Sequence, residues 1–94
     1  MEHINNFINN EIVPPQSKEY LDNYNPATGK VYSKVADSKD VDVAMAVVAA
    51  KKAFPAWAKK TAEERADYLY KIADLIDRDR EKFAVAESID QGKP

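Results

Sequence analysis

The strongest constraint on the fold is a predicted helix, over about residues 38–54, that is apolar on almost every side. One stripe at helical spacing contains Val43, Ala46, Val47, Ala50 and Phe54. A second stripe, on the opposite side, contains Val41, Ala44, Met45 and Val48. Ser38 is the expected N-cap, Asp40 and Asp42 suit the positive end of the helix dipole, and Pro55 is expected to end the helix. Such a helix must be buried on nearly all sides, which is more cover than a small domain supplies.

A second, longer helix is predicted over about residues 61–91. Thr61 and Glu64 have the spacing of a capping box, in which each side chain accepts a hydrogen bond from the other residue's backbone N–H. Gly92 is expected to end the helix, and Pro94 prevents its resumption. The apolar face includes Leu69, Ile72, Ala73, Ile76 and Phe83. Because the linker before Thr61 is short, we expect the two helices to form an αα-hairpin.

Short strands are predicted between about residues 4 and 36, ahead of both helices. Asn9 and Asn10 separate two apolar pairs, and asparagine tolerates positive φ, so we expect a β-hairpin there. Two further strands, over residues 20–24 and 30–36, flank a turn that contains Pro26 and Gly29. The expected architecture is therefore short N-terminal strands and hairpins followed by an αα-hairpin.

The composition excludes several functional classes. Sixteen acidic and fourteen basic residues give a formal charge of −2, without the basic excess of a nucleic-acid binder. The longest apolar run, Val43–Ala50, is far shorter than the roughly 20 residues that span a bilayer, and the start lacks the pattern of a secretory signal. We therefore expect no membrane partner and a cytoplasmic location. The absence of cysteine excludes disulfides, thiolate zinc sites and a thiol nucleophile within these residues.

No catalytic, cofactor-binding or metal-ligating residue is expected within the chain. His3, the only histidine, lies near a terminus, where chains usually fray. The pairs Glu63/Glu64 and Asp77/Asp79 lie among other charges on helix faces that should be solvated. The only two glycines lie too far apart to form a phosphate-binding loop.

Two further features have a structural and a functional interpretation. Phe54 and Trp57 flank Pro55, and a packed corner between the helices is favoured over a ligand-stacking site. Glu87 falls on the apolar stripe of the second helix, and a half-buried carboxylate needs a partner. We expect it to pair with Arg80, two turns away, or with chain outside these residues, rather than to act in catalysis.

The uncovered helix indicates either association with a partner or membership of a larger fold. A single helical hairpin and a few short strands cannot cover both apolar stripes. We favour a fragment of a larger protein. The alternative is a stand-alone helical-hairpin interaction module that uses Val41, Met45 and Val48 to bind another chain.

Five motifs, taken in order, resemble the opening of the aldehyde dehydrogenase superfamily. They are Phe7–Glu11, Asn25–Val31, Asp40–Asp42 with Ala53–Trp57, Glu64–Ala66 with Ile72–Ile76, and Glu87–Pro94. The form of Ser88–Gly92 is most similar to the muconic semialdehyde branch of that superfamily.

The resemblance implies that residues 1–94 are the N-terminal part of the cofactor-binding domain of an α/β enzyme that oxidises an aldehyde to a carboxylic acid. In that family a cysteine attacks the aldehyde, hydride passes to the nicotinamide, and a glutamate-activated water hydrolyses the thioester. All of these residues lie downstream of this segment in the family. The isolated chain is therefore expected to be catalytically inert and to bind no cofactor.

The resemblance also implies a cofactor and partners for the parent enzyme. The cofactor would be NAD or NADP, the rest of the domain would cover the apolar helix, and the assembly would be a homo-oligomer. Some family members hold a monovalent cation with a backbone carbonyl just before the Asn-Pro turn, here Asn23 or Tyr24. Backbone ligation leaves no side-chain pattern, so no metal site is assigned. The aldehyde, and the choice between NAD and NADP, depend on residues that the chain does not contain.

Overall fold

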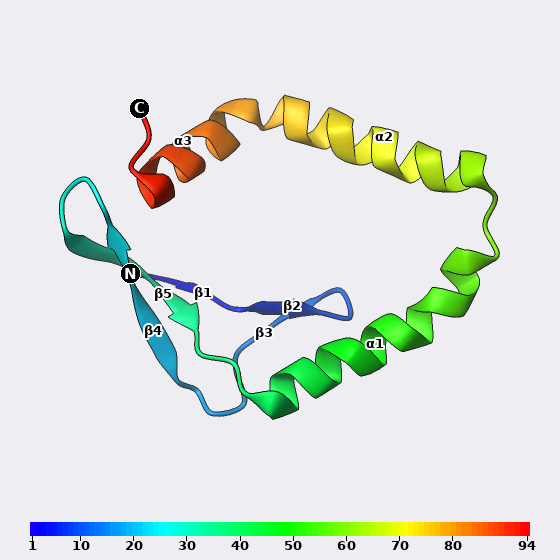
Figure 1. Cartoon of the computed structure of the whole chain (residues 1–94), viewed down its shortest axis with the longest axis horizontal. Helices are drawn as coiled ribbons and strands as arrows, with labels where there is room; N and C mark the ends of the chain where they lie inside the picture. Colours follow the sequence, from blue (N-terminus) through cyan, green and yellow to red (C-terminus); the bar gives the residue numbers. More distant parts are fainter.

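A three-stranded sheet combines a hairpin of two consecutive strands with one strand from much earlier in the sequence (Figure 1). The computed structural model describes residues 1–94. The strands β1 (Glu2–Ile4), β4 (Tyr20–Asn25) and β5 (Lys30–Ala36) have the order β1-β5-β4, with β1 parallel and β4 antiparallel to β5. The expectation that His3 frays is wrong, because β1 pairs with β5 and the imidazole meets the Tyr20 ring edge-on at a centroid distance of 4.7 Å.

The predicted N-terminal hairpin is confirmed. It joins β2 (Asn6–Ile8) to the antiparallel β3 (Glu11–Val13) through a two-residue turn. Asn9 has φ of 53° and Asn10 has φ of 64°. Positive φ at both central positions is what a type I′ turn requires, and asparagine reaches it at low cost.

The first helix, α1 (Asp40–Ala58), continues through Pro55, so the expectation that Pro55 ends it is wrong. Proline removes one backbone donor and crowds the preceding turn, but it does not forbid a further turn on its C-terminal side. That turn forms here, and the Lys59 N–H donates to the Pro55 carbonyl at 3.2 Å.

The second helical region is two helices, α2 (Ala62–Arg78) and α3 (Arg80–Gln91), rather than the single helix expected. Asp79 interrupts it, with φ of −103° and ψ of 24°. The Arg78 guanidinium donates to the Asp79 carboxylate at 3.0 Å. Aspartate competes with helical hydrogen bonding through its own side chain, which favours a break at this position.

Both predicted caps of this region are confirmed. The Thr61 N–H donates to Glu64 Oε1 at 3.0 Å, and the Glu64 N–H donates to Thr61 Oγ1 at 3.1 Å. The Thr61 backbone hydrogen bond favours the charged carboxylate and lowers the pKa of Glu64. Gly92 ends α3 in a left-handed conformation with φ of 71°.

The helices form an open arc, so the expected αα-hairpin is wrong (Figure 1). α1 runs away from the strands, α2 runs back above it without packing along it, and α3 ends in contact with β4. α1 and α2 meet only near their shared corner, where the rings of Trp57 and Tyr68 lie 5.5 Å apart. A short linker fixes where two helices meet but not the angle between them.

No hydrophobic side chain forms a buried core. The buried residues are Pro15, Ser33 and Asp42. Large apolar side chains remain open on both the strands and the helices, with Ile12 75% exposed and Leu69 64% exposed. A typical small domain buries more than half of the surface of its unfolded chain. The apolar stripes of the helices, which we expected to be buried, are therefore exposed in residues 1–94.

Candidate functional site

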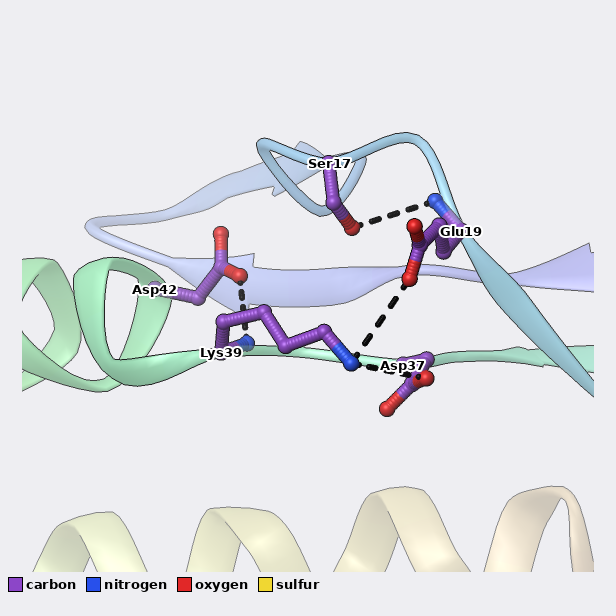
Figure 2. A network of polar contacts seen from close by, with 5 residues as sticks. All are labelled: Ser17, Glu19, Asp37, Lys39 and Asp42. Atoms are coloured by element: carbon purple, nitrogen blue, oxygen red, sulfur yellow. Dashed lines mark hydrogen bonds and ion pairs between the residues drawn. The ribbon is translucent and has the colours of Figure 1, made fainter.

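The N-terminus of α1 is anchored by the buried carboxylate of Asp42 (Figure 2). Its Oδ2 accepts from the Lys39 N–H at 2.9 Å, and its Oδ1 accepts from the Gln16 N–H at 3.0 Å. Lys39 rather than Ser38 is thus the N-cap residue, and the Ser38 hydroxyl instead donates to Asn6 Oδ1 at 2.9 Å. The sequence placed Asp42 in the first turn, but nothing local indicated its long-range bond to Gln16.

The ammonium of Lys39 connects the end of β5 to the loop before β4 (Figure 2). It lies 3.0 Å from Asp37 Oδ2 and 3.6 Å from Glu19 Oε2. The hydrogen bond to Asp37, the charge of Asp37 and the nearby Glu19 raise the pKa of Lys39. Because these groups are largely solvent-exposed, the network positions the entry to α1 and offers no reactive group.

A second polar group joins the sheet to α3, and we name it the Asp90 cluster (Asn23, Tyr32 and Asp90). The Tyr32 hydroxyl donates to Asp90 Oδ1 at 2.9 Å, and Asn23 Nδ2 lies 3.4 Å from the same oxygen. Asn23 Nδ2 also lies 3.1 Å from the Tyr32 hydroxyl and 3.1 Å from Ser33 Oγ. The cluster fixes the C-terminal part of α3 against the β4–β5 hairpin.

The Asp90 cluster shifts the titration of two of its members. The hydrogen bond from Tyr32, followed by that from Asn23, lowers the pKa of Asp90. Desolvation, followed by the hydrogen bond to Asp90 and the negative charge of that carboxylate, raises the pKa of Tyr32. Asn23 was named only for its backbone carbonyl, and no local pattern predicts that its side chain and Tyr32 meet Asp90, because Asp90 lies 67 and 58 residues away from them.

The carboxylate pairs considered from the sequence do not converge on a catalytic arrangement. Glu64 is used in the cap of α2, while Glu63 is exposed. Asp77 pairs with Arg80, and Asp79 occupies the break between α2 and α3. Glu64, Asp77 and Asp79 therefore have structural roles, and Glu63 is solvated.

Of the two partners expected for Glu87, Arg80 is wrong, and a partner outside residues 1–94 stays a prediction. Glu87 Oε1 lies 3.5 Å from Lys93 Nζ instead, because Arg80 reaches back to Asp77. At the corner expected around Pro55, Trp57 contacts Tyr68, but Trp57 is 39% and Phe54 64% exposed, so the corner is not closely packed.

The described residues do not fit a dinucleotide site. Gly29 lies in the β4–β5 turn and Gly92 ends α3, so neither leads from a strand into a helix N-terminus, where a pyrophosphate would bind.

No three His, Cys, Asp or Glu side chains are grouped so that they could hold a metal ion. Asn23 and Tyr24 flank a register shift in β4, and a cation at their carbonyls stays an implication of the family resemblance. None of the helices is both long and apolar enough to traverse a membrane.

One candidate surface is the α1 face (Val41, Met45 and Val48). These side chains are 50%, 41% and 64% exposed. Together with Ala44, Ala49 and others they line an open groove of about 440 Å³. A continuous apolar surface of this kind is typical of an interface.

Comparison with known proteins identifies the family of the chain. Residues 12–94 match the aldehyde dehydrogenase family. The chain belongs to that family. It is 43% identical over 90 residues to 2-aminomuconic semialdehyde dehydrogenase from Homo sapiens, and 45% identical over 89 residues to an aldehyde dehydrogenase from Deinococcus radiodurans. These alignments cover 96% and 95% of this chain, but 18% and 17% of the relatives.

A solved structure gives the same result for the fold. A mutant aldehyde dehydrogenase from Bacillus cereus matches with a TM-score of 0.90 and 42% identity, over 97% of this chain and 19% of that one. The family and the α/β class expected from the aldehyde dehydrogenase motifs are thus confirmed. The chain spans less than a fifth of the length of these relatives, so the activity of a whole enzyme is a matter for proposal.

Proposed function

We propose that residues 1–94 are the N-terminal segment of the cofactor-binding domain of an NAD(P)-dependent aldehyde dehydrogenase. The parent enzyme oxidises an aldehyde to a carboxylic acid, and this segment is a scaffold on the flank of its domain. The segment alone is catalytically inert. A homo-oligomeric, cytoplasmic parent belongs to the same proposal and rests on the family resemblance.

The uncovered α1 face is the observation that carries this proposal. An all-round apolar helix needs cover on most sides, yet no hydrophobic residue of the chain is fully buried. The matching family members are more than five times as long, so the rest of such a polypeptide would be available to cover the α1 face.

The division of chemistry follows from the residues present. The chain has no cysteine to attack an aldehyde and no site that fits a dinucleotide. The nucleophile, the base that activates water and the NAD(P) site are therefore assigned to the remainder of the parent. The contribution of residues 1–94 is to hold α1, the strands and α3 in place.

The intact mass of the natural gene product, measured by mass spectrometry from its source cells, tests the proposal. A mass several times 10.6 kDa supports a full enzyme of which this chain is a part. A mass of 10.6 kDa overturns the proposal and favours the stand-alone interaction module.

Two assays separate the scaffold from the module more directly. Residues 1–94 alone should generate no NADH from any aldehyde above background, and reproducible turnover would contradict the proposal.

The double substitution Met45→Lys with Val48→Lys should unfold or destabilise the parent enzyme, because it places two charges against the covering domain. A module would instead lose a specific partner and stay folded.

A further inference from the structure

An open groove of about 700 Å³ separates the inner face of α3 from β1 and β5. Its apolar part is formed by Ile4 on one side and by Val85, Ala86 and Ile89 on α3. Ile4, Val85 and Ile89 are 43%, 48% and 37% exposed. The apolar side chains of β1 and of α3 therefore face each other across the groove and remain partly exposed to solvent.

The α3 wall is held in place by contacts at its C-terminal end. The Asp90 cluster ties α3 to β4 and β5 through hydrogen bonds of 2.9 and 3.4 Å. Gly92 lies so close to the β4–β5 turn that a Cβ atom there would lie 3.0 Å from Pro26 Cγ. These contacts set the position of the α3 wall relative to β4 and β5 at this end of the groove.

The rim of the groove is acidic. Glu2, Glu81 and Asp90 line it with a single basic residue, Lys82. Glu2, Glu81 and Lys82 make no ion pair in the structure, although six others are formed. The negative charges of Asp90 and Glu2 contribute, after desolvation and the Asp90 hydrogen bond, to raising the pKa of Tyr32 at the end of the groove. The potential at this rim therefore favours a cation.

We propose that this groove is the docking site for an apolar segment of the same polypeptide, outside residues 1–94, that carries a lysine or arginine. Its apolar side chains lie between Ile4 and Val85, and its cation lies between Glu2 and Glu81. The inference rests on the proposed function, which supplies a polypeptide long enough to provide the segment. It adds the location and the chemistry of one contact between this scaffold and the rest of the enzyme.

Site-specific photo-crosslinking in the full-length protein tests the contact. Val85 is replaced by p-benzoylphenylalanine, and the crosslinked peptides are mapped by mass spectrometry. We expect one intramolecular crosslink, to a segment beyond residue 94 that has apolar side chains and a lysine or arginine within about one helical turn. The same probe at Asp74, on the polar face of α2, is the matched control and should give no such crosslink.

Charge reversal tests the acidic rim. Glu81→Lys should reduce the yield of the Val85 crosslink and lower the melting temperature of the full-length protein, and high salt should weaken both effects. Glu63→Lys is the matched control, because Glu63 lies in the first turn of α2 as Glu81 lies in the first turn of α3. It carries the same penalty from the helix dipole and should lower the melting temperature slightly, but it should not change the yield of the Val85 crosslink. Equal behaviour of the two variants overturns the role of the cation.

The possible failures are distinguishable. A full-length enzyme whose Val85 probe crosslinks to nothing, or to a segment without a basic residue, overturns the docking inference and leaves the proposed function standing. A gene product of 10.6 kDa overturns both, and the intact mass shows it before any crosslink is attempted.

Discussion

Asp42 is a carboxylate whose two oxygens satisfy separate backbone donors at the start of α1. It is 4% exposed, and it links the N-cap residue Lys39 to Gln16 in the preceding loop. Both hydrogen bonds are part-buried, so a backbone N–H that loses this acceptor is only partly compensated by water. This side chain therefore fixes how α1 leaves the strands.

Replacing Asp42 with alanine should lower the free energy of unfolding of the full-length protein by about 1–3 kcal/mol, because two backbone donors lose their acceptor. Urea denaturation measures the change. Asp40→Ala, in the same helical turn but exposed, is the control and should have a much smaller effect. Equal losses in the two variants would show that the bonds of Asp42 contribute little.

The pKa of Asp90 gives a second test at the residue scale. Hydrogen bonds to its charged form lower the folded-state pKa, so the stabilisation is fully present above the unfolded-state pKa. It is lost as the pH falls through the folded-state pKa. Tyr32→Phe removes the largest cause, and the pKa of Asp90 should rise toward the ordinary aspartate value.

Carboxyl-carbon NMR titration of the full-length protein measures this pKa directly. Tyr70→Phe, at an exposed tyrosine of α2, is the matched control and should leave the pKa of Asp90 unchanged. An unchanged value in Tyr32→Phe would mean that the Tyr32 hydroxyl does not hold the carboxylate in solution.

At the scale of elements, the β2–β3 hairpin depends on two left-handed residues. Asn10→Val should destabilise the hairpin by about 1–2 kcal/mol, because a β-branched residue is strained at positive φ. Asn10→Gly should be neutral or stabilising, since glycine adopts φ of 64° freely. Hydrogen exchange of the β2 and β3 amides reports the difference, and equal protection in both variants would contradict the turn geometry.

The docking of α3 depends on Gly92. Alanine there meets two penalties, a positive φ and a Cβ atom 3.0 Å from Pro26 Cγ. Gly29→Ala has the same φ of 71° with open space around it, so it measures the backbone penalty alone. Thermal denaturation should show a larger loss for Gly92→Ala than for Gly29→Ala. Equal losses would mean that α3 is not seated against the β4–β5 turn.

The elements also show what sequence can and cannot predict. The Asn9–Asn10 turn, the Thr61 capping box and the Gly92 cap were predicted correctly because each depends on residues within one turn. The end of α1 and the break at Asp79 were not, because helix ends result from a balance between propensity and neighbouring contacts. β1, the bond from Gln16 to Asp42 and the Asp90 cluster join distant segments, and no local pattern indicates such pairs.

At the scale of the whole molecule, the open arc and the absence of a buried core predict the behaviour of residues 1–94 in isolation. Heating should give a broad transition without cooperativity, and the exposed apolar stripes should bind the dye ANS. Circular dichroism and dye fluorescence measure these properties. A single sharp transition without dye binding would show that the segment is a self-sufficient domain, and the alternative of an interaction module would then be favoured.

The parallel pairing of β1 with β5 has a consequence for biosynthesis. β1 is translated before the β2–β3 hairpin and β4, but its hydrogen-bonding partner β5 is translated only after them. The hairpin closes locally and rapidly, whereas the edge that β1 occupies exists only once β5 has been translated. β1 (Glu2–Ile4) therefore joins β5 after the β2–β3 hairpin can already have closed, so the parallel pairing is a late step in the assembly of this sheet.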